Sequence, residues 1–102
     1  MNTLLQTAAF TDWLHDLKDS VGRARVLLRL RAMEASHFGD AAAVGDGVSE
    51  LRIHIGPCYR IYYARQQQAV YLLLVGGTKS SQKHDIKQAK QLWKLVQAAP
   101  AA

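Results

Sequence analysis

The segment Glu50-Leu-Arg-Ile-His-Ile-Gly-Pro-Cys-Tyr-Arg-Ile-Tyr-Tyr-Ala-Arg65 decides how the chain folds, because it predicts two strands joined by a tight turn at Gly56-Pro57. Apolar and polar residues alternate along its first half: Leu51, Ile53 and Ile55 against Glu50, Arg52 and His54. Successive side chains of a strand point to opposite faces. One face of the first strand is therefore apolar, and the other carries a carboxylate, a guanidinium and an imidazole.

The polar face of this hairpin has two interpretations. The second strand places Arg60 and Tyr62 on one face, opposite to Tyr59, Ile61 and Tyr63. Cationic and aromatic groups on a rigid sheet suit an anionic partner such as a nucleic acid. The alternative is the ordinary solvated face of an antiparallel sheet, which is normally polar.

Length and composition predict one domain, residues 1–97, followed by a frayed tail, residues 98–102. A composition of 49% hydrophobic and 21% charged residues is typical of a soluble globular protein. The longest apolar run, residues 69–75, is far shorter than the roughly 20 residues of a membrane-spanning helix. The N-terminus lacks a signal-peptide pattern, and the single Cys58 has no partner for an internal disulfide. We therefore expect a cytoplasmic protein without membrane contact.

Positive charge is concentrated in the second half of the chain. Residues 1–50 contain five Lys and Arg against seven Asp and Glu, net −2, whereas residues 51–102 contain eight against one, net +7. Clustered basic charge is the electrostatic footprint of a nucleic-acid-binding protein. It is equally compatible with a surface that docks an acidic protein.

Two helices are predicted before the hairpin. Thr7 is a candidate N-cap for the first, which has an apolar stripe made of Phe10, Trp13, Leu14 and Leu17. Leu4 and Leu5 before it are compatible with a short strand. The second helix is expected from about Ser20 to Ala35, with a stripe made of Leu27, Leu30 and Met33. Its arginines, Arg23, Arg25, Arg29 and Arg31, are interpreted as a solvated face.

The rest of the chain predicts a loop, a strand and a helix. Small residues at 41–47 indicate a loop between the helices and the sheet. Val70–Val75 does not alternate, which favours a strand covered on both faces that ends at Gly76-Gly77. Ser80 or Ser81 is expected to cap a last helix running to about Gln97. Its predicted buried stripe is Ile86, Ala89, Trp93 and Val96, and its basic stripe is Lys83, Lys87, Lys90 and Lys94.

The residue types favour cleavage of RNA over other chemistry. No histidine or cysteine spacing predicts a metal site, and no motif predicts a cofactor. RNA is cut when its 2′-hydroxyl attacks the adjacent phosphate, which needs proton-transfer groups and donors that stabilise charge on phosphorus. The candidates for these roles are Arg52, His54, Arg60 and Lys79, and Tyr62 is a candidate for stacking a base. The alternative for His54 is a surface histidine on a polar sheet face.

Ordered motifs along nearly the whole chain resemble a known family. They are Phe10-Thr-Asp-Trp-Leu, Leu17-Lys-Asp, Gly22-Arg-Ala-Arg, Phe38-Gly-Asp, Gly47-Val-Ser-Glu-Leu-Arg-Ile-His, Gly56-Pro, Tyr59-Arg-Ile-Tyr-Tyr and Gly76-Gly-Thr-Lys-Ser-Ser-Gln, followed by Asp85-Ile and Ala89-Lys. The set resembles the RelE/ParE superfamily of bacterial toxins, in the branch of the addiction-module killer, HigB and phage Gp49-like proteins. Two positions depart from that branch: Cys58 stands where glycine is common, and Thr78 where aspartate is common.

This resemblance implies both a fold and a function. The fold is α+β, with two N-terminal helices packed on a small, mainly antiparallel sheet and a C-terminal helix after it. The function is that of the toxin in a type II toxin–antitoxin pair, a metal-independent endoribonuclease that cleaves mRNA on the ribosome. The implied partners are the ribosome, mRNA and a cognate antitoxin, usually a helix-turn-helix DNA-binding protein.

Carried over by position, the resemblance assigns catalysis to Arg52, His54, Arg60 and Lys79. Together with the residue pattern, it makes Tyr62, Lys83 and Lys87 candidates for RNA binding. Two other functions stay open at this point. One is a ParE-like inhibitor of DNA gyrase without nuclease activity, and the other is a basic protein-interaction module.

Overall fold

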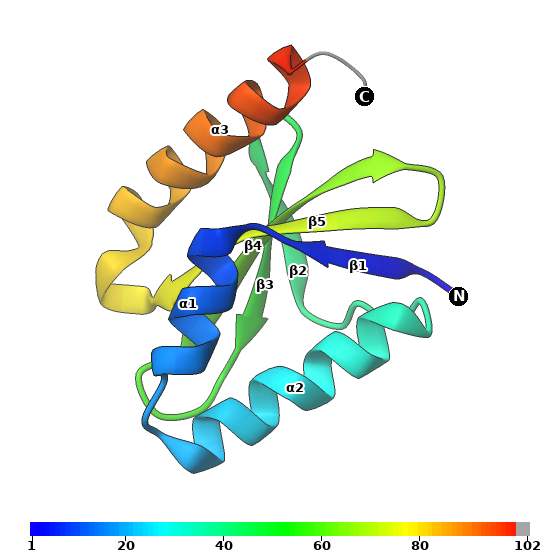
Figure 1. Ribbon diagram of the computed structural model, residues 1–102. Coiled ribbons are helices and arrows are strands. Elements are labelled where there is room, and N and C mark those ends of the chain that lie inside the picture. Colours follow the sequence, from blue (N-terminus) through cyan, green and yellow to red (C-terminus); the bar gives the residue numbers. More distant parts are fainter. Residues whose placement is uncertain (100–102) are drawn as a thin grey trace.

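The computed structural model describes residues 1–99 as an α+β fold, which confirms the predicted class. The elements in chain order are β1 (Thr3–Gln6), α1 (Ala8–Asp16), α2 (Ser20–Glu34), β2 (Ala41–Gly45), β3 (Val48–Ile53), β4 (Tyr59–Gln67), β5 (Val70–Thr78), the 3-10 turn η1 (Lys79–Ser81) and α3 (Gln82–Ala98) (Figure 1). Most of the predicted tail, residues 100–102, lies outside the described residues.

The five strands form one sheet in the order β1-β5-β4-β3-β2. The predicted hairpin is present, because β3 and β4 pair antiparallel, with Arg52 opposite Arg60. β4 and β5 also pair antiparallel, whereas β1 lies parallel to β5 at the edge. The sheet is therefore mainly antiparallel, and β4 is its central strand.

The loop predicted at residues 41–47 is wrong. Ala41–Gly45 forms the edge strand β2, which pairs antiparallel with β3. The true turn is Gly45-Asp46-Gly47, where all three residues have positive φ angles of 102°, 57° and 80°. Such angles favour glycine, so the glycines mark the turn and not a long loop. A run of alanines shows no alternation, which is why the strand before this turn left no pattern in the sequence.

The helices α1 and α2 cover one face of the sheet. The buried core between them and the sheet, here called the apolar face, contains Phe10, Leu14, Val26, Leu30, Met33, Leu51, Ile53, Tyr59, Ile61, Tyr63 and Leu73. Thr7 caps α1 as predicted, because its Oγ1 accepts from the Phe10 backbone N–H at 3.1 Å. Leu27 was expected in the stripe of α2 but is 42% exposed. Val26 is buried instead. Because α2 carries apolar residues on both its buried and its exposed side, hydrophobic periodicity did not show which of them face the sheet.

The helix α3 covers part of the opposite face. Its contacts with the sheet form a second core made of Val48, Tyr62, Ala64, Leu72, Leu74, Val75, Ala89 and Trp93. Ile86 and Val96 pack against that core, as expected for the predicted stripe. Leu73 and Leu74 of β5 belong to opposite cores, which confirms that this strand is covered on both faces. The strand does not end at Gly76-Gly77, because β5 continues through both glycines to Thr78.

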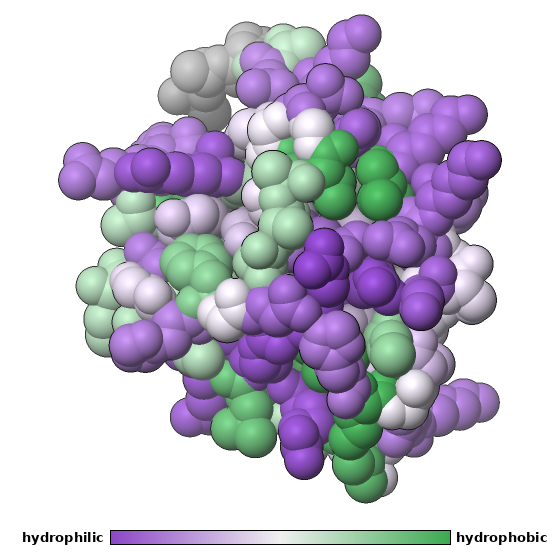
Figure 2. All heavy atoms as spheres, turned by 180° about the vertical axis from the view of Figure 1, so that it is seen from behind, coloured by the Kyte–Doolittle hydropathy of each residue, from purple (hydrophilic) through white to green (hydrophobic). Residues whose placement is uncertain are grey.

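The surface seen from behind is mostly hydrophilic, with small hydrophobic groups scattered across it (Figure 2). Within residues 1–99, the length and hydropathy of each helix fall short of what crossing a membrane requires.

Candidate functional site

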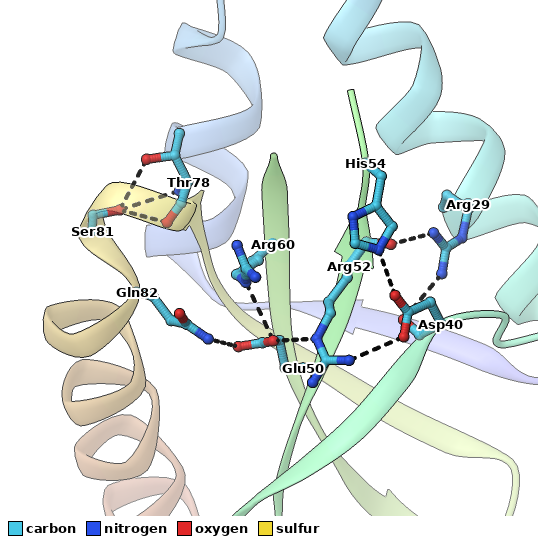
Figure 3. Close-up of polar contacts among 9 residues, drawn as sticks. All are labelled: Arg29, Asp40, Glu50, Arg52, His54, Arg60, Thr78, Ser81 and Gln82. Carbon is cyan, nitrogen blue, oxygen red and sulfur yellow. Dashed lines mark hydrogen bonds and ion pairs between the residues drawn. The ribbon is translucent and has the colours of Figure 1, made fainter. Parts of the chain in front are cut away.

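The polar residues of the β3–β4 hairpin lie on the sheet face that α3 partly covers (Figure 3). Strand register sets their order, because Arg52 of β3 lies opposite Arg60 of β4, and Arg60 lies opposite Gly77 of β5. In the next row, Glu50 lies opposite Tyr62. The hairpin thus brings Arg52, Arg60 and Glu50 into one cluster, as the alternation predicted for the two arginines.

Glu50 is the centre of this cluster, although it was not a predicted site residue. Its side chain is fully buried, with 0% exposed. Oε1 accepts from Arg52 Nε at 2.8 Å and lies 3.3 Å from Arg60 Nε, while Oε2 accepts from Gln82 Nε2 at 2.8 Å. Burial alone would raise the pKa of Glu50, but the hydrogen bonds from Arg52 and Gln82, together with the nearby Arg60 guanidinium, outweigh it and hold the pKa below its usual value. Glu50 is therefore a buried, ionised carboxylate.

Asp40 is the second carboxylate of the site, and it was not a predicted site residue either. Its Oδ1 lies 3.1 Å from Arg52 Nη1, and its Oδ2 lies 2.5 Å from His54 Nε2. The hydrogen bond with His54, supported by the nearby Arg52 guanidinium, holds the pKa of Asp40 below its usual value. Arg52 is consequently held from both sides, by Glu50 and Asp40. His54 keeps a side chain that is 62% exposed.

Arg29 of α2 anchors this end of the site. Its guanidinium donates to the carbonyl oxygen of Arg52, to that of Phe38 at 2.8 Å and to that of Asp40 at 3.4 Å. The interpretation of Arg29 as part of a solvated arginine face is therefore wrong. It ties α2 to the strand that carries Arg52 and to the segment that carries Asp40.

Arg60 differs from Arg52 in how completely it is partnered. Its side chain is 10% exposed, and its only ion pair within residues 1–99 is the 3.3 Å contact between its Nε and Glu50. The geometry of that contact is too poor for a hydrogen bond, and both Nε and the buried Nη1 have no hydrogen-bond partner among the described residues. A buried guanidinium N–H without a partner is unfavourable. Both atoms have almost no exposed surface, so binding an anion through them requires the Arg60 side chain to move.

The prediction that Tyr62 stacks a base is wrong. Its side chain is fully buried in the core under α3, so neither face of the ring is open to a ligand. Burial, together with the nearby carboxylate of Glu50, raises the pKa of its phenol above the usual value. Alternation assigned Tyr62 correctly to the face of Arg60, but it could not show that α3 covers that part of the face.

The predicted lysines lie beside the cluster and not inside it. Lys79 starts η1 directly after Thr78, whose strand partner is Tyr59, and its side chain is exposed. Lys83 and Lys87 are exposed on the first turns of α3. In residues 1–99 none of the three forms an ion pair. These lysines contribute positive charge at the rim of the site.

The start of α3 is fixed by a short polar network. Ser81 is the N-cap residue, but its hydroxyl does not cap the helix. It donates to Asp85 Oδ2 at 2.5 Å and accepts from the Thr78 backbone N–H at 3.1 Å. Gly77 makes room for this network, because a Cβ there would lie 1.8 Å from Asp85 Oδ2. The network holds Gln82 in reach of Glu50.

A groove of about 350 Å³ lies at the His54 end of the cluster. It is lined by Arg25, Leu28, Arg29, Ile53, His54 and Ile55. The groove joins basic and apolar groups next to the imidazole, so it can accommodate part of a ligand that contacts His54. Within residues 1–99, no group of three or more His, Cys, Asp or Glu side chains is arranged to hold a metal ion.

The arrangement brings together three of the four predicted catalytic residues, Arg52, His54 and Arg60. Lys79 is nearby at the end of the neighbouring strand. The arginines can bind and polarise a phosphate, and the exposed imidazole can transfer a proton. What the sequence interpretation missed is the pair of carboxylates. Glu50 was visible on the polar face beside Arg52, but Asp40 and Gln82 come from distant segments.

Comparison with known proteins gives two matches. The family model described as "Phage derived protein Gp49-like (DUF891)" matches residues 12–94, which is most of the chain. An uncharacterized protein of Haemophilus influenzae is 43% identical over 86 residues, which cover 84% of this chain and 87% of that protein. Every residue of the polar cluster lies inside the matched range.

Proposed function

This chain belongs to the Gp49-like family of phage-derived proteins, a family associated with toxins of toxin–antitoxin systems, and we propose that it is such a toxin. Its activity in this proposal is that of a metal-independent endoribonuclease that cleaves mRNA on the ribosome and so inhibits translation. A cognate antitoxin, a helix-turn-helix DNA-binding protein, holds it inactive.

The observation that carries this proposal is the pairing of Arg52 with Arg60 on the sheet face that also carries the exposed His54. A guanidinium in a site with little solvent binds phosphate oxygens more strongly than one in water. Arg60 has N–H groups without partners, and Arg52 shares the Glu50 carboxylate with it. RNA phosphate is the anion that suits two planar guanidinium groups next to a proton-transfer group.

Each residue has one role in the proposed reaction. Arg60 and Arg52 bind the scissile phosphate and stabilise the charge that develops on it. His54 transfers a proton, and Asp40 orients the imidazole through Nε2. His54 accepts the proton of the 2′-hydroxyl as the 2′-oxygen bonds to phosphorus and the bond from phosphorus to the 5′-oxygen breaks. The leaving 5′-oxygen takes up a proton from solvent, which produces a 2′,3′-cyclic phosphate and a 5′-hydroxyl end. Lys79, Lys83 and Lys87 attract the remaining phosphates of the RNA.

The direct test is a reconstituted translation reaction that contains the purified full-length protein. We expect mRNA cut within the translated region, with 2′,3′-cyclic-phosphate ends. Arg60→Ala should lower the cleavage rate by roughly 100-fold or more, the loss typical of removing one group that stabilises transition-state charge. Intact mRNA on translating ribosomes would refute the nuclease.

A matched control and a second assay separate the alternatives. Arg65→Ala removes an exposed arginine from the far end of β4, and it should leave cleavage unchanged. A supercoiling assay with DNA gyrase tests the ParE-like alternative on the same preparation. Gyrase inhibition with intact mRNA would replace the nuclease by that function, and inactivity in both assays would leave a protein-interaction module.

A further inference from the structure

Gln82, the first residue of α3, donates to the buried Glu50, which in turn contacts both arginines of the site (Figure 3). We propose that Glu50 and Gln82 are positioning residues that orient Arg60 toward the phosphate of the substrate. The identity of that phosphate as RNA rests on the proposed function. The orientation itself is a property of these side chains and can be tested without catalysis.

The two oxygens of Glu50 have different partners, and this division defines its orientation. Oε2 accepts from Gln82 at 2.8 Å, so the carboxylate cannot rotate without losing that bond. Oε1 is consequently held toward Arg52 Nε at 2.8 Å and Arg60 Nε at 3.3 Å. Gln82 therefore determines where Oε1 lies, and Oε1 determines where the two guanidinium groups lie.

The partners of each arginine indicate which one is being positioned for a ligand. Arg52 has two hydrogen-bonded anchors, because Glu50 binds its Nε and Asp40 binds its Nη1. Arg60 has only the longer contact with Glu50, and its Nη1 is buried without a partner within residues 1–99. Glu50 thus lies against the Nε side of the Arg60 guanidinium, and Arg60 has one carboxylate neighbour where Arg52 has two.

The surroundings of Glu50 argue against a purely structural role. Its neighbours on this face include buried Val48 and Tyr62, so an apolar side chain would suit the same core. An ionised carboxylate buried here carries a desolvation penalty, and replacing buried ion pairs by apolar groups is often neutral or stabilising. A buried carboxylate is useful where it fixes side chains that must bind a ligand in one geometry, because such side chains need supporting contacts that hold them in place.

The position of Gln82 extends the consequence to α3. Gln82 follows the Thr78–Ser81–Asp85 network that fixes the start of the helix. Any displacement of the first turn of α3 would withdraw the amide from Glu50 and release Arg60. A ligand or partner that moves this turn would therefore alter phosphate binding without touching either arginine.

The test uses the full chain and the variant Gln82→Ala, because Gln82 lies at the edge of the site and its loss leaves both cores intact. The first measurement is the nitrogen-15 NMR signal of the Arg60 and Arg52 Nε–H groups. The second is the affinity for an all-2′-deoxy trinucleotide, a phosphodiester that cannot be cleaved by its own 2′-hydroxyl. We expect faster solvent exchange of the Arg60 Nε–H and a loss of affinity of roughly 10-fold, with backbone amide signals retained.

Two further variants separate positioning from structure. Glu50→Gln combined with Gln82→Glu exchanges the carboxylate and the amide, and it should recover part of the affinity that Gln82→Glu alone loses, since the hydrogen bond between the two positions is restored. Gln82→Ala should cost less affinity when added to Arg60→Ala than when made alone, because the contributions of interacting residues are not additive. Gln91→Ala, an exposed change on α3, should leave both measurements unchanged.

The proposal is overturned if folded Gln82→Ala keeps both the Arg60 Nε–H exchange rate and the trinucleotide affinity of the original protein. Additive losses in Gln82→Ala and Arg60→Ala would also overturn it. Failure of the proposed nuclease is distinguishable from this outcome. In that case mRNA stays intact in the translation reaction, while the NMR signals and the trinucleotide affinity still respond to Gln82→Ala.

Discussion

The two faces of the sheet are built from the same strands but use opposite chemistry. On the apolar face, under α1 and α2, the buried side chains are aliphatic or aromatic. On the other face, under α3, the buried residues include Glu50, Arg60 and Asp85. Alternation along β3 and β4 produces this division, since Leu51 and Ile61 point one way while Glu50 and Arg60 point the other. The apolar face stabilises the fold, and the face under α3 holds charged side chains in fixed positions.

Two neighbouring glycines repeat this difference on a small scale. A Cβ on Gly76 would lie 2.2 Å from the ring of Trp13 in α1, and a Cβ on Gly77 would lie 1.8 Å from Asp85 Oδ2 in α3. Gly76 thus allows an aromatic ring to approach the sheet, whereas Gly77 allows a carboxylate to do so. Substitutions on the apolar face should therefore change stability, whereas substitutions on the face under α3 should also change function. The following predictions test this separation.

The largest expected effect is a loss of stability on the apolar face. Phe10 is fully buried in the core of α1, so Phe10→Ala removes a packed ring and leaves a cavity. We expect the free energy of unfolding to fall by about 3 to 5 kcal/mol, measured by urea denaturation. Cleavage per folded molecule should stay close to normal under conditions where the variant is folded. A loss of cleavage activity in folded Phe10→Ala would contradict the claim that the apolar face affects stability and not function.

Glu50→Gln is the corresponding change on the face of α3. It removes the charge that two arginines share, and we expect a loss of about 3 kcal/mol at neutral pH, where bonds to a buried charge are broken. The pH dependence follows from the lowered pKa of Glu50. Its stabilising effect is complete above the unfolded value of 4.5 and is lost as the pH falls through the lower folded value.

The stability difference between the original protein and Glu50→Gln should therefore shrink in acid. Urea denaturation of both proteins between pH 7 and pH 3 measures it, with Phe10→Ala as the reference whose difference contains no titrating group. A difference that stays constant down to pH 3 would contradict the assignment of Glu50 as an ionised, paired carboxylate. Cleavage by Glu50→Gln should be reduced even where the protein is fully folded.

The adjacent glycines give a smaller and sharper comparison. Gly76→Ala forces the partly buried Trp13 to move and Gly77→Ala forces the buried Asp85 to move, and each should cost about 1 to 3 kcal/mol. Only Gly77→Ala should also lower RNA cleavage, because displacing Asp85 disturbs Ser81 and the first turn of α3. The ratio of cleavage to folded protein in the two variants is the measurement. Equal activity in both would mean that the start of α3 does not control the site.

The sequence predicted those elements whose pattern alternates or repeats cleanly. The hairpin and the capped helix α1 were found in this way, whereas the doubly covered strand β5 was found from its continuous apolar run. The alanine-rich strand β2 was missed because it has no such pattern. The helix α2 was predicted with nearly its observed bounds, but Leu27 was assigned to its buried side in place of Val26. The end of β5 was predicted too early, because two adjacent glycines are typical of a strand end. In the structure the strand continues through them, and each glycine lets a side chain from a helix pack closely on the strand.

The site was predictable only as far as one hairpin reaches. Alternation placed Arg52, His54 and Arg60 together, because their separation is fixed by strand register. It could not find contacts that bridge distant segments, such as Asp40 with His54 or Gln82 with Glu50. Alternation also could not predict that α3 buries Tyr62, because which residues of a sheet face are covered depends on how a later helix packs across the sheet.

The smallest expected effect lies in the turn between β3 and β4, which belongs to neither face. Cys58 has a φ angle of 58°, in the left-handed region that favours glycine. Cysteine therefore holds a conformation here that glycine adopts without strain. Cys58→Gly removes the backbone strain but raises the entropy of the unfolded chain, so the two effects partly cancel. Cys58→Ala is the matched control, because it deletes the thiol and keeps the strain.

We expect Cys58→Gly to be more stable than Cys58→Ala by about 0.5 to 1 kcal/mol in urea denaturation. Cleavage should be the same in both variants, because the pairing of Arg52 with Arg60 is set by the strands and not by the turn residue. If Cys58→Gly changed cleavage without changing stability, the turn would be part of the functional face. The division between a stabilising face and a functional face would then have to include the loop that joins β3 to β4.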